Sequence, residues 1–306
     1  MFQIISDAGC EFTKEEAKQF NVEIIPFYIT FDGTTHLKDG IDITKDAYFT
    51  RLIEEKDLFP KTSQPTPQDY IDMYTPHLKA GKDILSFTIS SKLSGTNNSA
   101  RLAASMLEAE YPNRKIAVVD SLNASIGEGL ILREIIKMRD AGHTLDETVA
   151  MAAEVIKSAH VYLTVDTLEY LKRGGRIGPT TALVGGILGL KPILQLVDGE
   201  VSQLDNVRGK KRVIKLMEDG MVAALSGDKE NVSLCFGHIR NPEDAVAFKT
   251  SAETALGVKV DLPAVEIGVT IGTHAGPGAL GFAYCKKYEC LNKAAVNKVQ
   301  TKRQAV

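Results

Sequence analysis

A hydroxyl-rich loop directly follows an apolar run in the first third of the chain. Residues Ile84 to Ile89 have the length and the β-branched, apolar composition of a strand, whereas Ser90 to Gly95 (SSKLSG) interrupt that pattern. Arg101 to Glu108 then has the composition of a helix. A strand, a Ser/Gly turn and a helix in this order place N–H groups and hydroxyls at a positive helix end, which favours a carboxylate or a phosphate. An ordinary Ser/Gly connection is the competing interpretation.

A second hydroxyl-rich loop, TSQPTP, begins at Thr62. Thr66 followed by Pro67 is a typical helix start, so capping explains the hydroxyl of Thr66. Capping does not explain Thr62 and Ser63. These two residues precede the predicted strand at Ile84 to Ile89 in sequence, and they are the nearest further candidates for an anion site.

Three basic or titratable groups could contribute to such a site. The KRGGRIG segment places Arg173 and Arg176 around a glycine pair, either as an anion clamp or as a solvated helix end. Arg208 begins a basic cluster that is either ordinary surface or a contact for a phosphate or an acidic partner. His274 lies in a glycine-rich segment, residues 272–281, which we expect to be a loop whose backbone approaches a ligand closely. A structural role is the alternative for a lone histidine.

One segment offers an apolar counterpart to these polar groups. Residues Ile177 to Leu190 (IGPTTALVGGILGL) carry no charge and alternate small residues with branched aliphatic ones. The segment is either a buried helix or the lining of a roomy apolar pocket. The candidates for an acyl tunnel are Ile177, Leu183, Val184, Ile187, Leu188 and Leu190.

The surrounding pattern predicts an α/β fold. Strands alternate with helices in the first half, which indicates a mostly parallel sheet covered on both faces, with ligands at the carboxyl ends of its strands. The second half adds a hairpin with an Asp198-Gly199 turn, and we expect a mixed sheet there. We predict an N-terminal domain over residues 1–158, a C-terminal domain over 159–288 and a polar tail over 289–306. The ligand would lie between the two domains.

Composition narrows the class of protein. The chain has 306 residues, 44% of them hydrophobic, and a net charge of -3, which gives no reason to expect nucleic-acid binding. The amino terminus has no secretory pattern and no apolar run has membrane-spanning length, so we expect a cytoplasmic protein. The four cysteines show no metal-ligand spacing, and we expect free thiols and no metal.

Six motifs, taken together, resemble the DegV family. TSQPTP, SSKLSGTNNSA, VVDS, LEYLKRGGRIG, KPIL before a hairpin, and IGTHAGPGALG occur in the order and approximate spacing of that family, over residues 1 to about 288. The chain thereby resembles the fatty-acid-binding subunit (FakB) of bacterial fatty acid kinase. That resemblance implies a two-domain α/β protein that buries one acyl chain between its domains.

The resemblance also implies roles for individual residues. Thr62 and Ser94 would hydrogen-bond the fatty-acid carboxylate, with backbone N–H groups around Gly95 and Thr96, and His274 would lie close to it. The basic residues that would serve the carboxylate, the acyl phosphate or a kinase surface are Arg173, Arg176 and Arg208. The sequence departs from the family at Asn97 and Ala275, where a bulky residue and a hydroxyl are more usual.

We therefore predict a non-catalytic carrier that presents a long-chain fatty acid to a kinase partner for acyl-phosphate formation. ATP and Mg²⁺ would be used by the partner, because the chain has no Walker A motif. Transient contact with a membrane surface fits such a carrier. One alternative is a serine hydrolase using Ser94 and His274, although the sequence has no GxSxG motif. An enzyme acting on a small phosphorylated metabolite and a purely structural or regulatory module are the others.

Overall fold

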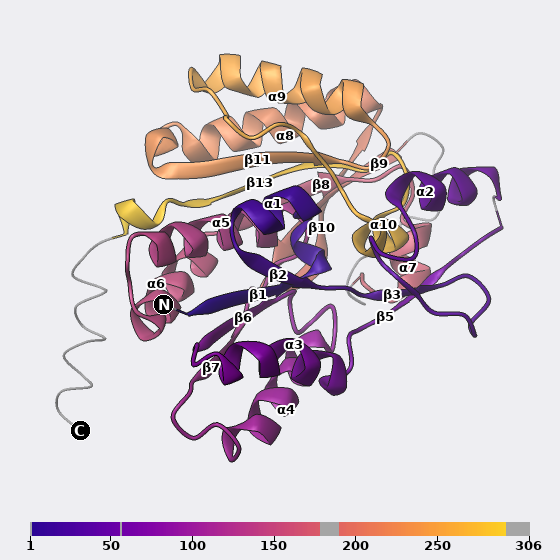
Figure 1. Cartoon of the computed structure of the whole chain (residues 1–306). Helices are drawn as coiled ribbons and strands as arrows, with labels where there is room; N and C mark the ends of the chain where they lie inside the picture. The colour runs from indigo at the N-terminus through magenta and orange to yellow at the C-terminus, as the bar shows by residue number, and fades with distance from the viewer. Residues whose placement is uncertain (1, 56, 178–189, 292–306) are drawn as a thin grey trace.

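The computed structural model describes residues 2–55, 57–177 and 190–291 and builds them into three β-sheets with helices packed around them (Figure 1). The first sheet is parallel, in the order β2-β1-β6-β7. Its strands are β1 (Gln3–Asp7), β2 (Val22–Ile25), β6 (Ile84–Thr88) and β7 (Ile116–Asp120). Both β1 and β6 are buried along their whole length, as expected for parallel strands covered on both faces.

Helices cover the two faces of this sheet. Successive residues of a strand point to opposite faces. Ile5 packs with α3 (Pro67–Lys79) and α4 (Thr96–Glu108), whereas Ile4 packs with α5 (Ile126–Asp140) and α6 (Leu145–Lys157). The short elements η1 (Ala8–Cys10) and α1 (Lys14–Gln19) lie between β1 and β2 in the chain.

The second sheet has the order β10-β9-β8-β13-β11-β12 and is mixed, because only β12 runs parallel to its neighbour among these strands. Helices α8 (Lys210–Leu225) and α9 (Pro242–Leu256) cover one of its faces with a cluster around Phe236, Phe248 and Phe282. The strands are β8 (His160–Thr164), β9 (Leu190–Val197), β10 (Glu200–Arg208), β11 (Val232–His238), β12 (Val265–Glu266) and β13 (Leu280–Lys286). The short helices η2 (Lys229–Asn231) and η3 (Tyr288–Cys290) flank β11 and β13 in the chain.

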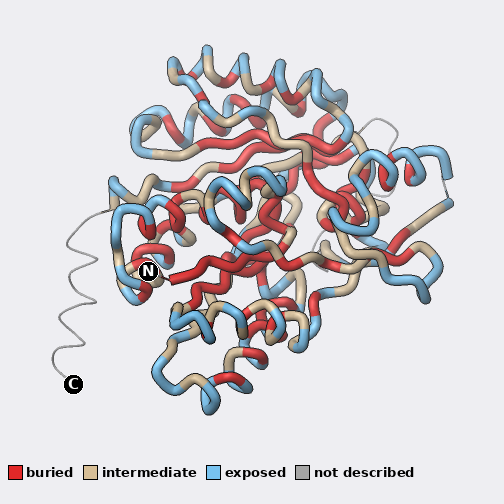
Figure 2. The backbone as a smooth tube through the Cα atoms, viewed as in Figure 1, coloured by how far each residue is buried: buried red, intermediate tan, exposed pale blue. Residues whose placement is uncertain are grey.

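Helix α5 joins the two large sheets. It packs against the first sheet and also against β11 and β13, and most of its residues are buried (Figure 2). Its buried residues include the charged Glu128, Glu134 and Arg139 as well as apolar side chains, so α5 is a core helix. The two sheets therefore share one hydrophobic layer.

A third, small sheet has the order β4-β3-β5, from β3 (Tyr28–Thr30), β4 (Leu37–Lys38) and β5 (Lys61–Ser63). With α2 (Lys45–Glu54) it packs against α7 (Glu169–Gly174) and α10 (Val269–Ala275), which come from the second half of the chain. Gly272 of α10 lies directly on the ring of Phe49, so that a Cβ at this position would overlap the ring.

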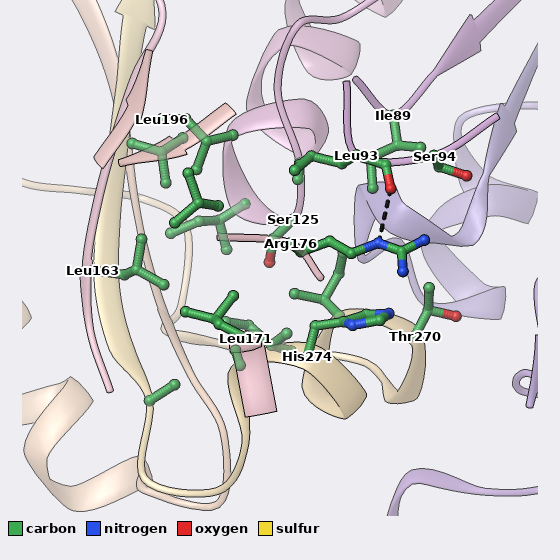
Figure 3. Close-up of a pocket in the computed structure, with 18 of the residues that line it drawn as sticks. Ile89, Leu93, Ser94, Ser125, Leu163, Leu171, Arg176, Leu196, Thr270 and His274 are labelled. Carbon is green, nitrogen blue, oxygen red and sulfur yellow. Dashed lines mark hydrogen bonds between the residues drawn. The ribbon is translucent and has the colours of Figure 1, made fainter. Parts of the chain in front are cut away.

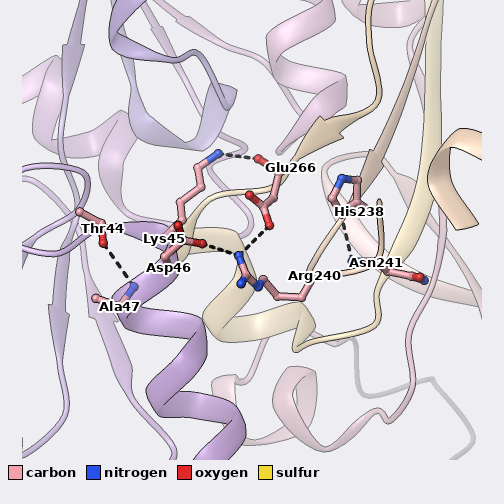
Figure 4. Close-up of polar contacts among 8 residues, drawn as sticks. All are labelled: Thr44, Lys45, Asp46, Ala47, His238, Arg240, Asn241 and Glu266. Atoms are coloured by element: carbon pink, nitrogen blue, oxygen red, sulfur yellow. Dashed lines mark hydrogen bonds and ion pairs between the residues drawn. The ribbon is translucent and has the colours of Figure 1, made fainter. Parts of the chain in front are cut away.

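Polar contacts also hold the start of α2 against the second sheet (Figure 4). Lys45 Nζ donates to the carbonyl oxygen of Glu266 at 2.5 Å. Arg240 Nη1 bonds the carboxylates of Asp46 at 2.6 Å and Glu266 at 3.2 Å. Helix α2 and strand β12 both border α10, so these contacts fix the surroundings of α10.

The structure confirms the α/β fold with a parallel first sheet and a mixed second sheet. Thr66 caps α3 with Pro67 in its first turn, and Asp198 and Gly199 both have positive φ in a two-residue turn between β9 and β10. The domain boundary at residues 158 and 159 stays a prediction. The described strands on its two sides belong to different sheets, and α5 packs against both.

Two local predictions were wrong. The glycine-rich segment 272–281 is not one loop, because its first residues belong to α10, which the buried residues Val269 and Thr273 and the close approach of Gly272 to Phe49 hold in helical form. Helix α4 starts at Thr96 instead of Arg101, since Gly95 serves as its N-cap. The hydroxyls of the SSKLSGT loop are thus nearer to a helix end than the sequence indicated.

The sequence also led to expectations about membrane-spanning segments, metal ions and cysteines. No described helix is long and apolar enough to cross a membrane. Within residues 2–55, 57–177 and 190–291, no group of three or more His, Cys, Asp or Glu side chains could hold a metal ion. All four cysteines are free thiols; Cys10, Cys235 and Cys285 are buried and Cys290 is exposed.

We expect Gly272→Ala to destabilise the protein by about 1–3 kcal/mol, because the added methyl group overlaps the buried ring of Phe49. Gly220→Ala is the matched control: Gly220 lies inside α8 with open space around it, and alanine there should stabilise by about 0.5–1 kcal/mol. Urea denaturation followed by circular dichroism measures both. Equal effects of the two substitutions would contradict the packing argument.

Candidate functional site

A cavity of about 360 Å³ lies between the second sheet and the loops that follow β2, β6 and β7 of the first sheet, and α10 lines one side of it (Figure 3). This volume falls within the range of small-molecule sites, about 300–1,000 Å³. Its polar lining residues include Thr62, Ser63, Gln64, Ser94, Ser125, Arg176, Thr270 and His274. Its apolar lining residues include Phe27, Ile89, Leu93, Ile126, Val161, Leu163, Leu171, Leu196, Val201, Ile267, Ile271 and Leu280.

Two carboxyl groups, the buried Asp7 and the partly exposed Asp120, fix the loop that follows β6. Asp7, at the end of β1, accepts from the N–H of Ile89 at 2.8 Å, and Asp120, at the end of β7, accepts from the N–H of Ser91 at 3.1 Å. The hydroxyl of Ser90 donates to the carbonyl oxygen of Gly199 at 2.7 Å, which joins the loop to the β9–β10 turn. The loop carrying Ser94 is therefore held from three strand ends.

The Ser94 hydroxyl lines the cavity and pairs with Thr96. Its Oγ accepts from the N–H of Thr96 at 3.3 Å and lies 2.7 Å from Thr96 Oγ1. If the Thr96 hydroxyl is the donor of that pair, the Ser94 proton has no acceptor among the described residues and is available to a ligand. Thr96 is fully buried, and Gly95 is exposed with the Gln64 side chain lying against it. In the described structure the cavity lining includes Ser94 but neither of these two neighbours.

His274 and Thr62 form a pair at the same end of the cavity. His274 Nε2 lies 2.8 Å from Thr62 Oγ1, and the other ring nitrogen, Nδ1, is buried against Gly174 with no hydrogen-bond partner among the described residues. A buried N–H without an acceptor costs more than a buried nitrogen without a donor. We therefore assign the proton to Nε2, which donates to Thr62 and leaves the Thr62 hydroxyl free to donate into the cavity.

The imidazole is neutral in this setting. Burial, and then the positive charge of Arg176, lower the pKa of His274 to about 4. Among the described residues that line the cavity, Arg176 is the one that carries a fixed positive charge, beside hydroxyl donors.

The two arginines of KRGGRIG have different surroundings. Arg176 lines the cavity; its Nε donates to the carbonyl oxygen of Leu93 at 3.0 Å and its Nη1 to that of Gly174 at 2.5 Å. Arg173 is exposed, pairs with Glu169 at 2.5 Å and lies over the ring of Phe59. Arg208, at the end of β10, is also exposed. In the structure, only Arg176 of these three described arginines is brought to the hydroxyl groups.

The apolar wall differs from the one expected from the sequence. Leu183, Val184, Ile187 and Leu188 lie outside the described residues. Ile177 packs on the cluster around Leu171, and Leu190 begins β9, but the described cavity lining includes neither. The described wall comes instead from β8, β9, β10 and β13 and from Ile89 and Ile126. Only the pairing of distant strands brings these residues together, so no local motif marks them.

The structure gives no support to a Ser94–His274 hydrolase. Ser94 bonds Thr96, and His274 bonds Thr62. A nucleophile and its base must lie within hydrogen-bonding distance of each other, with the base oriented by a third group. The described contacts do not bring these two side chains into such a pair.

Comparison with known proteins identifies the family. A family model described as an uncharacterised protein of the DegV family matches residues 1–287. This chain belongs to the DegV family. A DegV domain-containing protein of Clostridium acetobutylicum is 30% identical over 286 residues, which cover 94% of this chain and 99% of the relative.

Two solved DegV structures share the fold over nearly the whole chain. A stearic acid-binding protein from Eubacterium ventriosum has a TM-score of 0.90 and 32% identity, covering 95% of this chain and 100% of that one. A DegV family protein from Thermus thermophilus, described by its fatty acid binding, has a TM-score of 0.84 and 30% identity, covering 93% and 99%. The structural neighbours of this DegV chain are thus fatty-acid-binding proteins.

We expect His274 to titrate with a midpoint near pH 4, well below 6.5, in the ligand-free protein. Its pKa is lowered on folding, so the stability linked to its neutral form is present above about pH 6.5 and is lost as the pH falls towards 4. Ring ¹H–¹³C NMR spectra, assigned with His274→Gln, measure the midpoint. Arg176→Gln should raise it only in part, because burial is the larger cause. A midpoint near 6.5 would contradict the assigned environment.

Proposed function

We propose that this chain is a carrier that binds one long-chain fatty acid in the cavity and presents its carboxylate to a partner kinase. The observation that supports this best is the asymmetry of the cavity. Ser94, Arg176 and His274 gather on one side, whereas Leu163 and Leu196 lie on the other (Figure 3). A fatty acid has the same asymmetry, with one anion and a long apolar chain.

In this proposal Thr62 and Ser94 donate their hydroxyl protons to the carboxylate. His274 keeps Thr62 in the donating orientation through the 2.8 Å contact, and Thr96 does the same for Ser94 through its N–H and hydroxyl. The N–H of Gly95 and the positive end of α4 support the same charge. A desolvated carboxylate needs such donors, because burying it without hydrogen bonds is strongly unfavourable.

Arg176 supplies the countercharge, because its guanidinium lines the cavity beside these hydroxyls. The apolar walls supply most of the binding free energy, since each buried CH₂ contributes about 0.8 kcal/mol. Candidate residues of the acyl tunnel remain Ile177, Leu183, Val184, Ile187, Leu188 and Leu190, in addition to the described cavity walls.

The role of carrier for a kinase rests on the resemblance to the fatty-acid-binding subunit of fatty acid kinase. Phosphoryl transfer to the carboxylate would take place with ATP and Mg²⁺ bound by the kinase, and this chain would retain the acyl phosphate. Exposed Arg208, with Lys211 and Arg212 beside it, and Arg173 are the candidates for contact with the kinase or the phosphate. We place this activity in the cytoplasm, with transient contact to a membrane surface during lipid exchange.

The cavity disfavours a small phosphorylated metabolite as ligand. Such a molecule carries several polar groups along its length, whereas most residues that line the cavity are apolar. Burying polar groups without partners would cost free energy.

We expect the purified protein to bind a long-chain fatty acid, and Thr62→Val and Ser94→Ala each to weaken binding about 10- to 100-fold. This range corresponds to the loss of a hydrogen bond to a charged group, about 1.5–3 kcal/mol. Mass spectrometry of an organic extract identifies the bound acid, and titration with a fluorescent fatty acid gives the affinities. Exposed Ser91 provides the control, and Ser91→Ala should bind normally. An empty extract with no uptake of added fatty acid would refute the carrier proposal.

We expect no acyl phosphate when the protein, fatty acid, ATP and Mg²⁺ are combined without a kinase. Adding the ATP-binding subunit of a bacterial fatty acid kinase should produce acyl phosphate that depends on this chain. Arg208→Glu should lower that rate about tenfold or more through charge repulsion, with fatty-acid affinity unchanged. Lys259→Glu, at another exposed cation, is the control. Acyl phosphate is trapped with hydroxylamine; its formation without kinase would contradict the proposal.

A further inference from the structure

Ser125 has a strained backbone in the wall of the cavity. It follows the turn after β7 and precedes α5, and its φ of 55° and ψ of -135° fall in a region that glycine adopts readily and other residues avoid. Serine at this position normally caps a helix, yet its hydroxyl makes no capping hydrogen bond. The Ser125 hydroxyl therefore has a partner other than the N–H groups of the helix.

The hydroxyl is directed to a buried carboxylate. Ser125 Oγ donates to Glu11 Oε1 at 3.0 Å, and Glu11 Oε2 accepts from the N–H of Gly268 at 2.5 Å. Glu11 is 7% exposed. A hydroxyl, a base within hydrogen-bonding distance and a third group that orients the base are the signature of an activated nucleophile.

The turn has the shape of a nucleophile elbow although its sequence does not. Residues Asn123 to Gly127 (NASIG) place Gly127 so close to Asn123 and Val161 that a Cβ would overlap both. A serine on a sharp strand-to-helix turn is also the arrangement found in the GxSxG motif. Ile126, the residue after the serine, begins α5, so its N–H has no acceptor within the helix and would face a developing oxyanion.

Ser125 also lies between the apolar and the polar parts of the cavity wall. Figure 3 draws it between Leu163 and Leu196 on one side and Arg176 and His274 on the other. An acyl carbonyl at Ser125 would direct its chain to the apolar walls and its leaving group to the cationic, hydroxyl-lined end.

We propose that Ser125 is a nucleophile, with Glu11 as its general base, for hydrolysis of a long-chain acyl ester that bears a good anionic leaving group. The Ser125 Oγ–carbonyl bond forms while its proton passes to Glu11, and the bond to the leaving group breaks. Once Glu11 has released to solvent the proton that it took from Ser125, water attacks the acyl-serine and gives a proton to Glu11, and the acyl–Oγ bond breaks as Glu11 passes that proton to Oγ. The fatty acid remains in the cavity. This activity goes beyond the carrier role.

The charged surroundings of Glu11 suit a base that works near neutral pH. Burial raises its pKa to about 7, while Lys45, the N–H of Gly268 and Ser125 act in the opposite direction. Asp39, Glu128 and Cys235 are the other titratable groups coupled to it. Acylation should therefore speed up as the pH rises through about 7, where Glu11 loses its proton.

The test uses the full chain and p-nitrophenyl dodecanoate. We expect release of p-nitrophenolate and one acyl group on the Ser125 peptide after acid quenching, detected by mass spectrometry. Ser125→Gly should abolish both while keeping the fold, because glycine suits the backbone there. Glu11→Gln should slow release about 100-fold or more. Ser91→Ala, which removes an exposed hydroxyl outside the cavity lining, should react as the wild type does.

Peptide mapping of the wild-type protein decides the outcome even if a variant fails to fold. An acyl group on Ser94 or Ser63, or release no faster than with Ser125→Gly, would overturn the proposal. Uptake of a fluorescent fatty acid is measured in parallel. Uptake without acylation rejects the nucleophile and keeps the carrier, whereas acylation without uptake of free acid supports the nucleophile and rejects the carrier.

Discussion

The position of helix α10 depends on carboxylates from the other half of the chain. Asp39 accepts from both the N–H and the hydroxyl of Thr270, at 3.0 and 2.6 Å, and Glu11 accepts from the N–H of Gly268. These bonds lie at the start of α10, where the N–H groups have no partner within the helix. They bring His274, near the other end, against Thr62. The polar end of the cavity exists because acidic groups distant in sequence accept hydrogen bonds from the N–H groups at the start of this short helix.

The cavity separates two kinds of interaction. Among the described residues, hydroxyls, one neutral imidazole and one guanidinium are concentrated at one end, where carboxyl groups at the ends of β1 and β7 hold the loop that carries Ser94. The apolar walls come from side chains on the second sheet and on neighbouring loops. The first set requires accurate positions, because hydrogen bonds depend on distance and angle. The second set requires only shape and volume, because the hydrophobic effect has no direction.

Local sequence signals predicted much of the fold and part of the site. Strand runs, the Thr66–Pro67 helix start and the Asp198-Gly199 turn depend on neighbouring residues, and the structure contains each of them. Thr62, Ser94, Arg176 and His274 were named from their motifs and lie around one cavity. The apolar walls and Ser125 were missed. The apolar walls form through pairing between strands that are distant in sequence. The role of Ser125 depends on the carboxylate of Glu11, which lies 114 positions away. No local pattern encodes either of them.

Helix α5 has a consequence for any attempt to divide this protein. Its residues belong to the first half of the chain, but it packs against strands of both large sheets. A fragment ending near residue 158 would leave the side of α5 that meets β11 and β13 in water. The complementary fragment would lose the cover of those strands. The two sheets are therefore separate in sequence and inseparable as folding units, so that a split-protein reporter built from them would need both halves present to become compact.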